Sequence, residues 1–333
     1  MLLFKKKPDK VKSNFFILLL MLTISSATLF AVKKAVDESA SFRLPVWIQT
    51  SGTTPPRMAS LNEFKILQGK SPVEVTSLAT PAAPTQLFIA FDTVGDVANI
   101  TEARNALIRE IGALGKQYRV GILSANEQVT VIQEPTASRE LLAQKINGMS
   151  QIGKAGLLDN LIPVADLATA VLLHTKVRVA VIFITDSDIA NYKTDYTNAP
   201  VNASDSRDLS RRFAGRALQE KITRMSKGIA RFQVPIFVVH ITPGEDTLNR
   251  NYQNGLKQLA EIGGGRCFLS KSIGDVSSTI HEAFAWVQGF YLIGFQLTGA
   301  KGSYANIEIN WAPKETTPGE TFRLIHPNKV FIP

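Results

Sequence analysis

The sequence is poor in the residues that build disulfide frameworks and soft-metal sites. It holds one cysteine, Cys267, in 333 residues, so it can form no internal disulfide and no multi-cysteine metal centre. Cys267 stands in a short apolar run, where we expect a buried thiol that packs as a small hydrophobic side chain. The four histidines are scattered and form no His-Glu-x-x-His motif. They are His174, His240, His281 and His326.

Several enzyme and nucleic-acid signatures are also missing. There is no Gly-x-Ser-x-Gly elbow and no phosphate-binding P-loop. The run Gly263–Gly265 follows a helical pattern instead of opening one, so it predicts a helix end. The net charge is +9; from residue 28 onward, 32 basic and 27 acidic residues leave +5. No basic stripe alternates with aromatic residues, so we expect no nucleic-acid partner.

The N-terminus has the residue pattern of an export signal. The lysine-rich start, Lys5–Lys12, precedes the apolar run Phe15–Ile24, and small residues follow at Ser25–Ala27. This pattern predicts a signal peptide over residues 1–38, or an uncleaved signal anchor of about 18 apolar residues. In both cases the lysines stay in the cytoplasm and the rest is exported. The mature chain is then periplasmic, secreted or anchored in the inner membrane facing outward.

Three segments with different sequence patterns follow the N-terminal segment. Residues 39–83 hold short apolar pieces separated by Gly, Pro, Ser and Thr, residues 84–289 alternate strands with helices, and residues 290–333 alternate with period two. The middle segment predicts a doubly wound, mostly parallel α/β sheet with helices on both faces. Residues 119–121 and 129–131 predict a hairpin that adds one antiparallel edge strand. The flanks each lack a partner layer, so we expect them to form one small β subdomain.

Acidic residues follow the two most apolar strands of the middle segment. Asp92 and Asp96 come after the first, and Asp186 comes after the strand that ends at Thr185, with Asp188 as a further candidate. Ligands bind at the carboxyl ends of strands in open parallel sheets, and carboxylates suit Ca²⁺ or Mg²⁺. Without an ion, mutual repulsion should raise the pKa of at least one of these carboxyl groups. Asn99 with Glu102 predicts a capping box at the start of the next helix.

The layout resembles a von Willebrand factor A (VWFA) domain. That family places a metal-ion-dependent adhesion site on three loops: Asp-x-Ser-x-Ser, a later Thr, and an Asp after the central strand. Asp92 and Asp186 match the two aspartates of that pattern. Val94 and Asp96 stand where the serines would be, and Ala155 stands at the Thr. The resemblance therefore implies a VWFA fold that binds a protein partner, with a degenerate adhesion site.

A narrower group covers more of the chain, about residues 40 to 333. These are the exported VWFA-related domains first catalogued in acidobacteria, which have a β-rich prelude, the A domain and a β tail. Leu61–Lys70 resembles the prelude turn of that group, Leu259–Phe268 resembles its Leu-Ala-x-x-Thr-Gly-Gly-Arg-x-Phe motif, and Tyr291–Phe295 resembles its first tail strand.

These patterns favour an extracytoplasmic protein-binding or scaffold module that is not an enzyme and needs no cofactor. Two alternatives stay open: a metal-dependent phosphohydrolase that uses Asp92 and Asp186, and a membrane-tethered regulatory subunit of a larger envelope assembly. A Ca²⁺ or Mg²⁺ site would use Asp92, Asp96 and Asp186. The predicted partner-binding rim consists of Thr93, Val94, Gly95, Lys154, Ala155, Ser187 and Asp188.

Export is directly testable. A reporter enzyme that is active only outside the cytoplasm, fused behind residues 1–40, should be active because the lysine cluster and apolar run direct translocation. N-terminal sequencing of the product would distinguish cleavage after Ala27 from anchoring. Persistent retention of the fusion in the cytoplasm would contradict the prediction.

Overall fold

The computed structural model describes residues 40–50, 58–153, 155–187, 207–242, 247–313 and 321–332. The predicted leader, residues 1–38, lies outside these ranges, as do Lys154 and Asp188. Among the described residues, no helix combines the length and the apolar character needed to cross a membrane.

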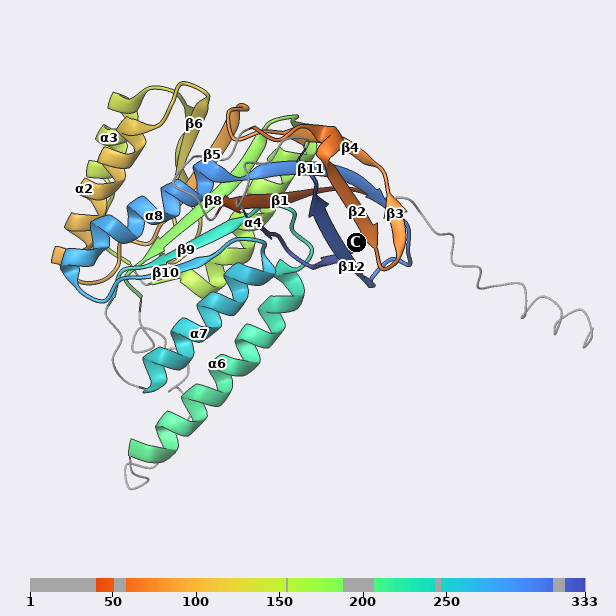
Figure 1. The fold of residues 1–333 in the computed structure, drawn as a ribbon. Helices are drawn as coiled ribbons and strands as arrows, with labels where there is room; N and C mark the ends of the chain where they lie inside the picture. Colours follow the sequence, from red (N-terminus) through yellow and green to blue (C-terminus); the bar gives the residue numbers. More distant parts are fainter. Residues whose placement is uncertain are drawn as a thin grey trace, which may run out of the picture.

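A six-stranded sheet forms the centre of the molecule, in the order β10-β9-β8-β5-β6-β7 (Figure 1). All neighbours pair in parallel except β6 and β7, so the predicted antiparallel edge strand is confirmed. Every residue of β8 is buried, which explains its continuous apolar run. The strands are β5 (Thr85–Phe91), β6 (Tyr118–Ser124), β7 (Thr130–Thr136), β8 (Arg178–Thr185), β9 (Ile236–His240) and β10 (Cys267–Leu269).

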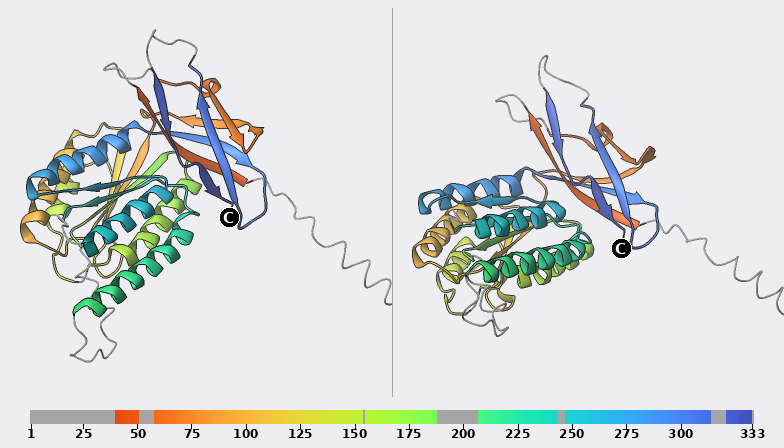
Figure 2. Two further views of the ribbon diagram at one scale, coloured as in Figure 1. Left: turned by 60° about the horizontal axis from the view of Figure 1, so that its bottom comes forward. Right: turned by 90° about the horizontal axis from the view of Figure 1, so that it is seen from below.

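Helices cover both faces of this sheet (Figure 2). Helix α2 packs against α3 and α8 on one face, and α6 packs against α4 and α7 on the other. The predicted doubly wound α/β class is therefore confirmed. The helices are α2 (Val97–Ala113), α3 (Arg139–Asn147), α4 (Leu157–His174), α6 (Arg207–Ile229), α7 (Thr247–Ile262) and α8 (Val276–Gly289).

The start of α2 differs from the prediction. The capping box of Asn99 with Glu102 is wrong, because the helix begins at Val97 and Asp96 is its N-cap. The Asp96 carboxylate accepts the backbone N–H groups two and three positions later, at 2.9 and 3.1 Å. Aspartate is a strong N-cap residue, and the Asn99 amide is instead used by Asp186.

The two flanks assemble into a β-sandwich, as predicted. One four-stranded sheet has the order β13-β1-β11-β4 and the other β14-β12-β2-β3. Strands from opposite ends of the chain pair in both sheets, β1 with β11 and β12 with β2. The N-terminal strands are β1 (Ala40–Thr50), β2 (Phe64–Gln68), β3 (Ser71–Val73) and β4 (Val75–Ala79), and the C-terminal ones are β11 (Tyr291–Leu297), β12 (Tyr304–Trp311), β13 (Phe322–Ile325) and β14 (Lys329–Phe331).

Side chains of β1 fasten the sandwich to two helices of the α/β part, along a contact that we call the seam. Arg43 Nη1 donates to the carbonyl oxygens of Leu172, at 2.9 Å, and Thr175, at 2.7 Å. Trp47 Nε1 donates to the carbonyl oxygen of Trp286 at 2.8 Å. The last carbonyls of a helix have no partner within the helix, so these donors satisfy the ends of α4 and α8 and fix the sandwich in place.

Arg178 at the start of β8 completes the seam. Its guanidinium donates to the carbonyl oxygens of Thr80, at 3.0 Å, and Val287, at 2.8 Å. The same group lies 4.1 Å from the ring centroid of Phe290. The side chain is fully buried, and burial lowers the pKa of Arg178. It therefore ties the linker before β5 and the end of α8 to the central sheet.

The glycine run ends α7, as predicted. Gly264 has φ +73°, its N–H donates to the carbonyl oxygen of Glu261, and the N–H of Gly265 donates to that of Ala260. This is the Schellman arrangement, in which a left-handed residue closes the helix. A Cβ atom on Gly265 would overlap the backbone oxygen of Ile236 in β9, so the chain can enter β10 only with glycine there.

Two glycine substitutions should change stability in opposite directions. Gly265→Ala should lower the free energy of unfolding by roughly 2–3 kcal/mol, because backbone must move to admit the methyl group. Gly112→Ala, in α2, meets no atom within 4 Å and should raise it by roughly 0.5–1 kcal/mol. Urea unfolding of both variants measures this, and a tolerated Gly265→Ala would show that the strand entry is wrongly placed.

Candidate functional site

The candidate site lies where β5, β6, β8 and β9 end, which we call the carboxyl edge of the sheet. Chain connections run in opposite directions from β5 and β8, which are neighbours, and ligands of α/β sheets bind at such switch points. Asp92 follows β5 and Asp186 follows β8. The Asp92 N–H donates to the carbonyl oxygen of Ile184 at 2.8 Å, so both acidic residues emerge side by side.

Asp92 is fully buried and its carboxylate is enclosed by donors from its own chain. Oδ1 accepts the backbone N–H of Val94 at 3.1 Å, and Oδ2 accepts the hydroxyl of Thr185 at 3.0 Å. The backbone N–H of Gly156, from the loop before α4, donates to the same carboxylate. Both oxygens therefore accept hydrogen bonds from the protein itself.

A chain of hydroxyl groups extends from Asp92 to α7. A hydroxyl carries one hydrogen, so when Thr185 donates to Asp92, Ser187 Oγ donates to Thr185 Oγ1 across 2.7 Å, and the Tyr252 hydroxyl donates to Ser187 across 2.9 Å. His240 Nε2 donates to the carbonyl oxygen of Ser187 at 2.7 Å. These residues are all buried, so His240 contributes to a buried hydrogen-bond network.

Asp186 is satisfied in the same way. Its Oδ1 accepts the side-chain amide of Asn99 at 3.1 Å and the hydroxyl of Thr242. Its Oδ2 accepts the backbone N–H of Asp96 at 2.5 Å. The backbone of Gly95 lies so close that a Cβ atom there would overlap the Asp186 carboxylate. The loop after β5 thus closes over Asp186, and only glycine permits that approach.

The three predicted carboxylates share one edge but do not form a cation cage. The Asp96 side chain turns toward the N-terminus of α2. Across the described ranges, no group of three or more His, Cys, Asp or Glu residues is placed to hold a metal ion. A hard cation needs oxygen lone pairs that face it, whereas N–H and O–H hydrogens face Asp92 and Asp186. Within the described residues, both carboxylates therefore have partners from the protein itself, and Asp96 does not join them as a third cation ligand.

Burial, more than repulsion, perturbs the acidity of this site. It raises the pKa of Asp92 from 3.8 to about 7, and it also raises the pKa of Asp186. The hydrogen bonds from Val94, Thr185 and Gly156 oppose the shift at Asp92, and the charge of Asp186 is the smallest of the contributing causes. The predicted direction is right, but the predicted cause, repulsion between carboxylates, is minor.

Amide side chains join the loops of the carboxyl edge to one another. Asn126 Oδ1 accepts the N–H of Thr93 at 3.1 Å, and its Nδ2 donates to the carbonyl oxygen of Ile152 at 3.2 Å. Asn160, from α4, donates to the carbonyl oxygen of Ala125 at 2.7 Å. Sequence reasoning missed these residues; for Asn126, its place just after an apolar strand was the available signal. The missed residues of the network are Asn99, Asn126, Asn160, Thr185, Thr242 and Tyr252.

The exposed surface of the edge differs from the predicted rim. Some predicted residues face inward, because their hydroxyl groups belong to the buried network. Thr93 and Ser187 are buried and cannot touch a partner, Val94 and Ala155 are half-buried, Gly95 is exposed, and Lys154 and Asp188 lie outside the described residues.

Two apolar side chains project from the same edge. Val97, the first residue of α2, is 64% exposed, and Ile152, in the loop before α4, is 85% exposed. Asp96 is exposed beside Val97. Exposed apolar side chains that stand together at one edge gain free energy when a partner covers them. We call Val94, Gly95, Asp96, Val97 and Ile152 the apolar rim.

No protein-family model and no curated protein matches the chain. Among solved structures, it is similar to proximal thread matrix protein 1 from the mussel byssus (13% identity, TM-score 0.42, 67% of this chain and 51% of that one). It is also similar to the PilB minor pilin of Streptococcus sanguinis (12%, TM-score 0.45, 62% of each chain). A third is the vWF domain of the type V pili tip protein Mfa5 of Porphyromonas gingivalis (11%, TM-score 0.40, 61% of this chain and 94% of that one).

The match spans about half the length of the mussel protein and less than two thirds of the pilin. Likeness of this degree carries no argument about function, which has to come from the site itself.

Divalent ions should leave the melting temperature unchanged within about 1 °C. A native-state ligand at a hundred times its Kd would add about 2.7 kcal/mol of stability, or several degrees in a chain of this size. Thermal melts in chelator, Mg²⁺ and Ca²⁺ measure this. Asp186→Ala should melt lower in every buffer, because Asn99, Thr242 and the Asp96 N–H lose their acceptor.

Asp166→Ala is the matched control, since that carboxylate forms only an exposed ion pair with Arg231 and its loss should cost little. A Mg²⁺-specific rise in melting temperature that disappears in Asp186→Ala would restore the metal-ion-dependent adhesion site.

The buried carboxyl group should make the protein less stable at alkaline pH. The pKa of Asp92 is about 7 when folded and 3.8 as its reference value, so folding favours its protonated form. The stability from this group is fully present below pH 3.8 and is lost as pH rises through 7. Asp92→Asn removes this titration, so between pH 5 and 8 its unfolding free energy should fall less than that of the wild type, by at most about 3 kcal/mol.

Urea unfolding of wild type, Asp92→Asn and the exposed control Asp166→Asn at several pH values measures that difference. Equal pH slopes for wild type and Asp92→Asn would contradict the raised pKa.

Proposed function

We propose that the chain is a protein-binding module whose apolar rim contacts its partner directly, without a bridging metal ion. One observation carries this proposal: Val97 and Ile152 are exposed at the switch-point edge, directly beside carboxylates that are already satisfied by protein donors. Exposed apolar side chains on a rigid, loop-built edge are typical of partner-binding sites.

The geometry gives less support to catalysis. A phosphohydrolase that used Asp92 would need that carboxylate to reach a substrate, yet Asp92 is fully buried and hydrogen-bonded. Burial raises the pKa of Cys267 to about 12, so it is a poor nucleophile at neutral pH. His240 is held by the backbone of Ser187. The proposal is therefore a binding protein and not an enzyme.

The proposed location is outside the cytoplasm. Its support is the lysine-rich and apolar N-terminal segment, together with the resemblance of the chain to exported VWFA-related domains of acidobacteria. Membership of that group remains part of the proposal. If the segment is uncleaved, the same protein would be a membrane-tethered subunit that presents the apolar rim to an envelope partner.

Site-specific photo-crosslinking in intact cells of the native source tests the binding edge. A photoreactive phenylalanine analogue at Ile152 should give a discrete adduct with a partner, and the adduct should persist in chelator. Leu173 is the matched control, because it is also a large exposed apolar residue, 63% exposed. It lies near the far end of α4, about 24 Å along the helix from Leu157, whereas Ile152 lies in the loop before that first residue.

Different outcomes separate the alternatives. Equal labelling from Ile152 and Leu173, or none from Ile152, would refute the apolar rim as a binding surface. An Ile152 adduct that disappears in chelator would show that an ion bridges the partner.

A further inference from the structure

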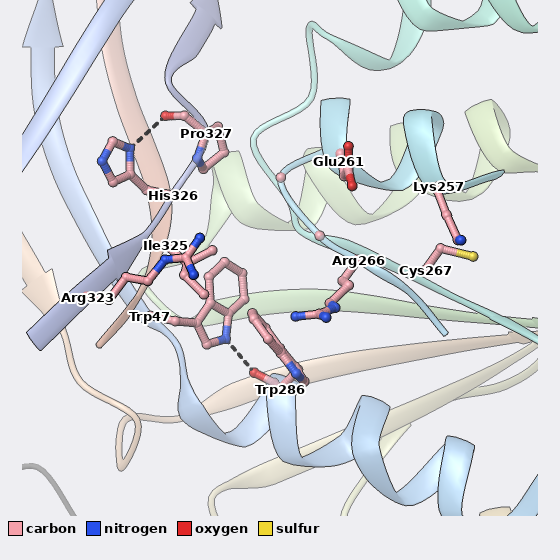
Figure 3. Close-up of a pocket in the computed structure, with 12 residues that line it drawn as sticks. Trp47, Lys257, Glu261, Arg266, Cys267, Trp286, Arg323, Ile325, His326 and Pro327 are labelled. Carbon is pink, nitrogen blue, oxygen red and sulfur yellow. Dashed lines mark hydrogen bonds between the residues drawn. The ribbon is translucent and has the colours of Figure 1, made fainter. Parts of the chain in front are cut away.

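A recess lies at the seam, at the opposite end of the sheet from the apolar rim. The pocket, which we call the seam pocket, has a volume of about 410 Å³. It lies where β10 begins, which is the amino edge of the sheet, and the sandwich strands β1 and β13 form its other side (Figure 3). The residues that line it include Trp47, Lys257, Glu261, Arg266, Trp286 and Arg323.

Two tryptophans form a rigid apolar wall. Trp47 is only 6% exposed, and its Nε1 is fixed by the carbonyl oxygen of Trp286. The two indole rings lie 5.2 Å apart at their centroids. The side chain of Trp286 is half-buried and lines the pocket, so part of its indole ring is open to the pocket. The wall is therefore formed before any ligand arrives, which reduces the entropic cost of binding.

Positive charge surrounds this wall. Arg266 lies with its guanidinium carbon 4.8 Å from the Trp286 ring centroid, and Arg323 extends from β13 on the other side of Trp47 (Figure 3). Lys257 adds a third cation, against one carboxylate, Glu261. Within the described ranges, none of these three cations forms an ion pair with a carboxylate. The pocket thus has unpaired cations around an aromatic wall.

We propose that the seam pocket binds an acidic segment of a protein partner that carries an aromatic side chain between carboxylates. The aromatic ring would pack against Trp286 and Trp47, where stacked or edge-on rings are stabilised. The flanking carboxylates would accept hydrogen bonds from Arg266 and Arg323, whose planar guanidinium groups match carboxylate geometry. Tryptophan and arginine are the residues most enriched in the energetic centres of protein interfaces.

The exposure of the pocket favours a polypeptide over a free small molecule. Arg266, Arg323 and Lys257 are all exposed, so the cations stand around an open mouth above the buried Trp47. Small-molecule sites bury most of the ligand surface, which an open recess does not. A partner segment needs to insert only one side chain, while its neighbours meet the charged mouth. This inference is independent of the apolar rim, which lies at the other edge of the sheet.

Tryptophan fluorescence of the full chain provides the test. The Trp311→Phe background removes the third tryptophan, which packs on Phe322 in the sandwich, so the signal reports Trp47 and Trp286. The probe is the blocked peptide Glu-Glu-Phe-Glu-Glu, with Lys-Lys-Phe-Lys-Lys, Glu-Glu-Ser-Glu-Glu and free 4-phenylbutyrate as comparisons. Only the first should change the fluorescence saturably at sub-millimolar concentration, and salt should weaken its binding.

Variants separate the pocket from general charge attraction. Arg266→Gln with Arg323→Gln should weaken the peptide roughly tenfold or more, because two charge-assisted hydrogen bonds are lost. Arg216→Gln on α6, an exposed cation outside the pocket, should leave the affinity unchanged. Circular dichroism and the melting temperature check that each variant is folded.

The alternatives have distinct signatures. No saturable binding of the acidic aromatic peptide, or equal weakening in Arg216→Gln, would overturn the proposal. Equal affinity for Glu-Glu-Ser-Glu-Glu would also overturn it, because the aromatic wall would then play no part. Binding of 4-phenylbutyrate without the peptide would assign the pocket to a small carboxylate instead.

Discussion

Two carboxylates that are buried side by side on folding organise the carboxyl edge of this protein. Asp92 and Asp186 end neighbouring strands in the middle of the sheet, where burial raises the pKa of both. A buried carboxylate without partners is costly, and here the chain supplies them: Thr185 for Asp92, and Asn99 with Thr242 for Asp186. These donors come from different elements, so satisfying the two acids also fixes the loops that form the edge. In VWFA domains an ion would supply part of this compensation.

At the other end of the molecule, hydrogen bonds of the seam likewise satisfy polar groups and fix neighbouring elements. Arg43, Trp47 and Arg178 donate to carbonyl groups at the ends of two helices and in the linker before β5. The sandwich is therefore fixed to the sheet by hydrogen bonds that the helix ends require anyway. The same bonds position Trp47 in the wall of the seam pocket. The apolar rim and the seam pocket thus lie at opposite edges of one sheet.

Periodic features of this fold could be predicted from the sequence, whereas side-chain directions could not. Continuous apolar runs identified the buried strands, and period-two alternation identified the flanks that pair in the sandwich. The predicted N-cap of α2 was wrong. Asp96 and Asn99 are both good capping residues, and only the tertiary position of Asp186 decides between them. The predicted partner-binding rim was wrong in part for the same reason. Thr93 and Ser187 look like exposed loop residues, but their hydroxyl groups face a buried network that the linear sequence does not reveal.

If the protein's own donors take the place of an adhesion-site ion, no metal ion should bind between Asp92 and Asp186. Anomalous diffraction from crystals grown with Mn²⁺, a scatterer that substitutes for Mg²⁺, tests it most directly. We expect no anomalous peak at the carboxyl edge, with Thr185 still bonded to Asp92 and the Asp96 N–H still bonded to Asp186. A peak within about 2.0–2.6 Å of an oxygen of either carboxylate, with those donors displaced, would contradict it.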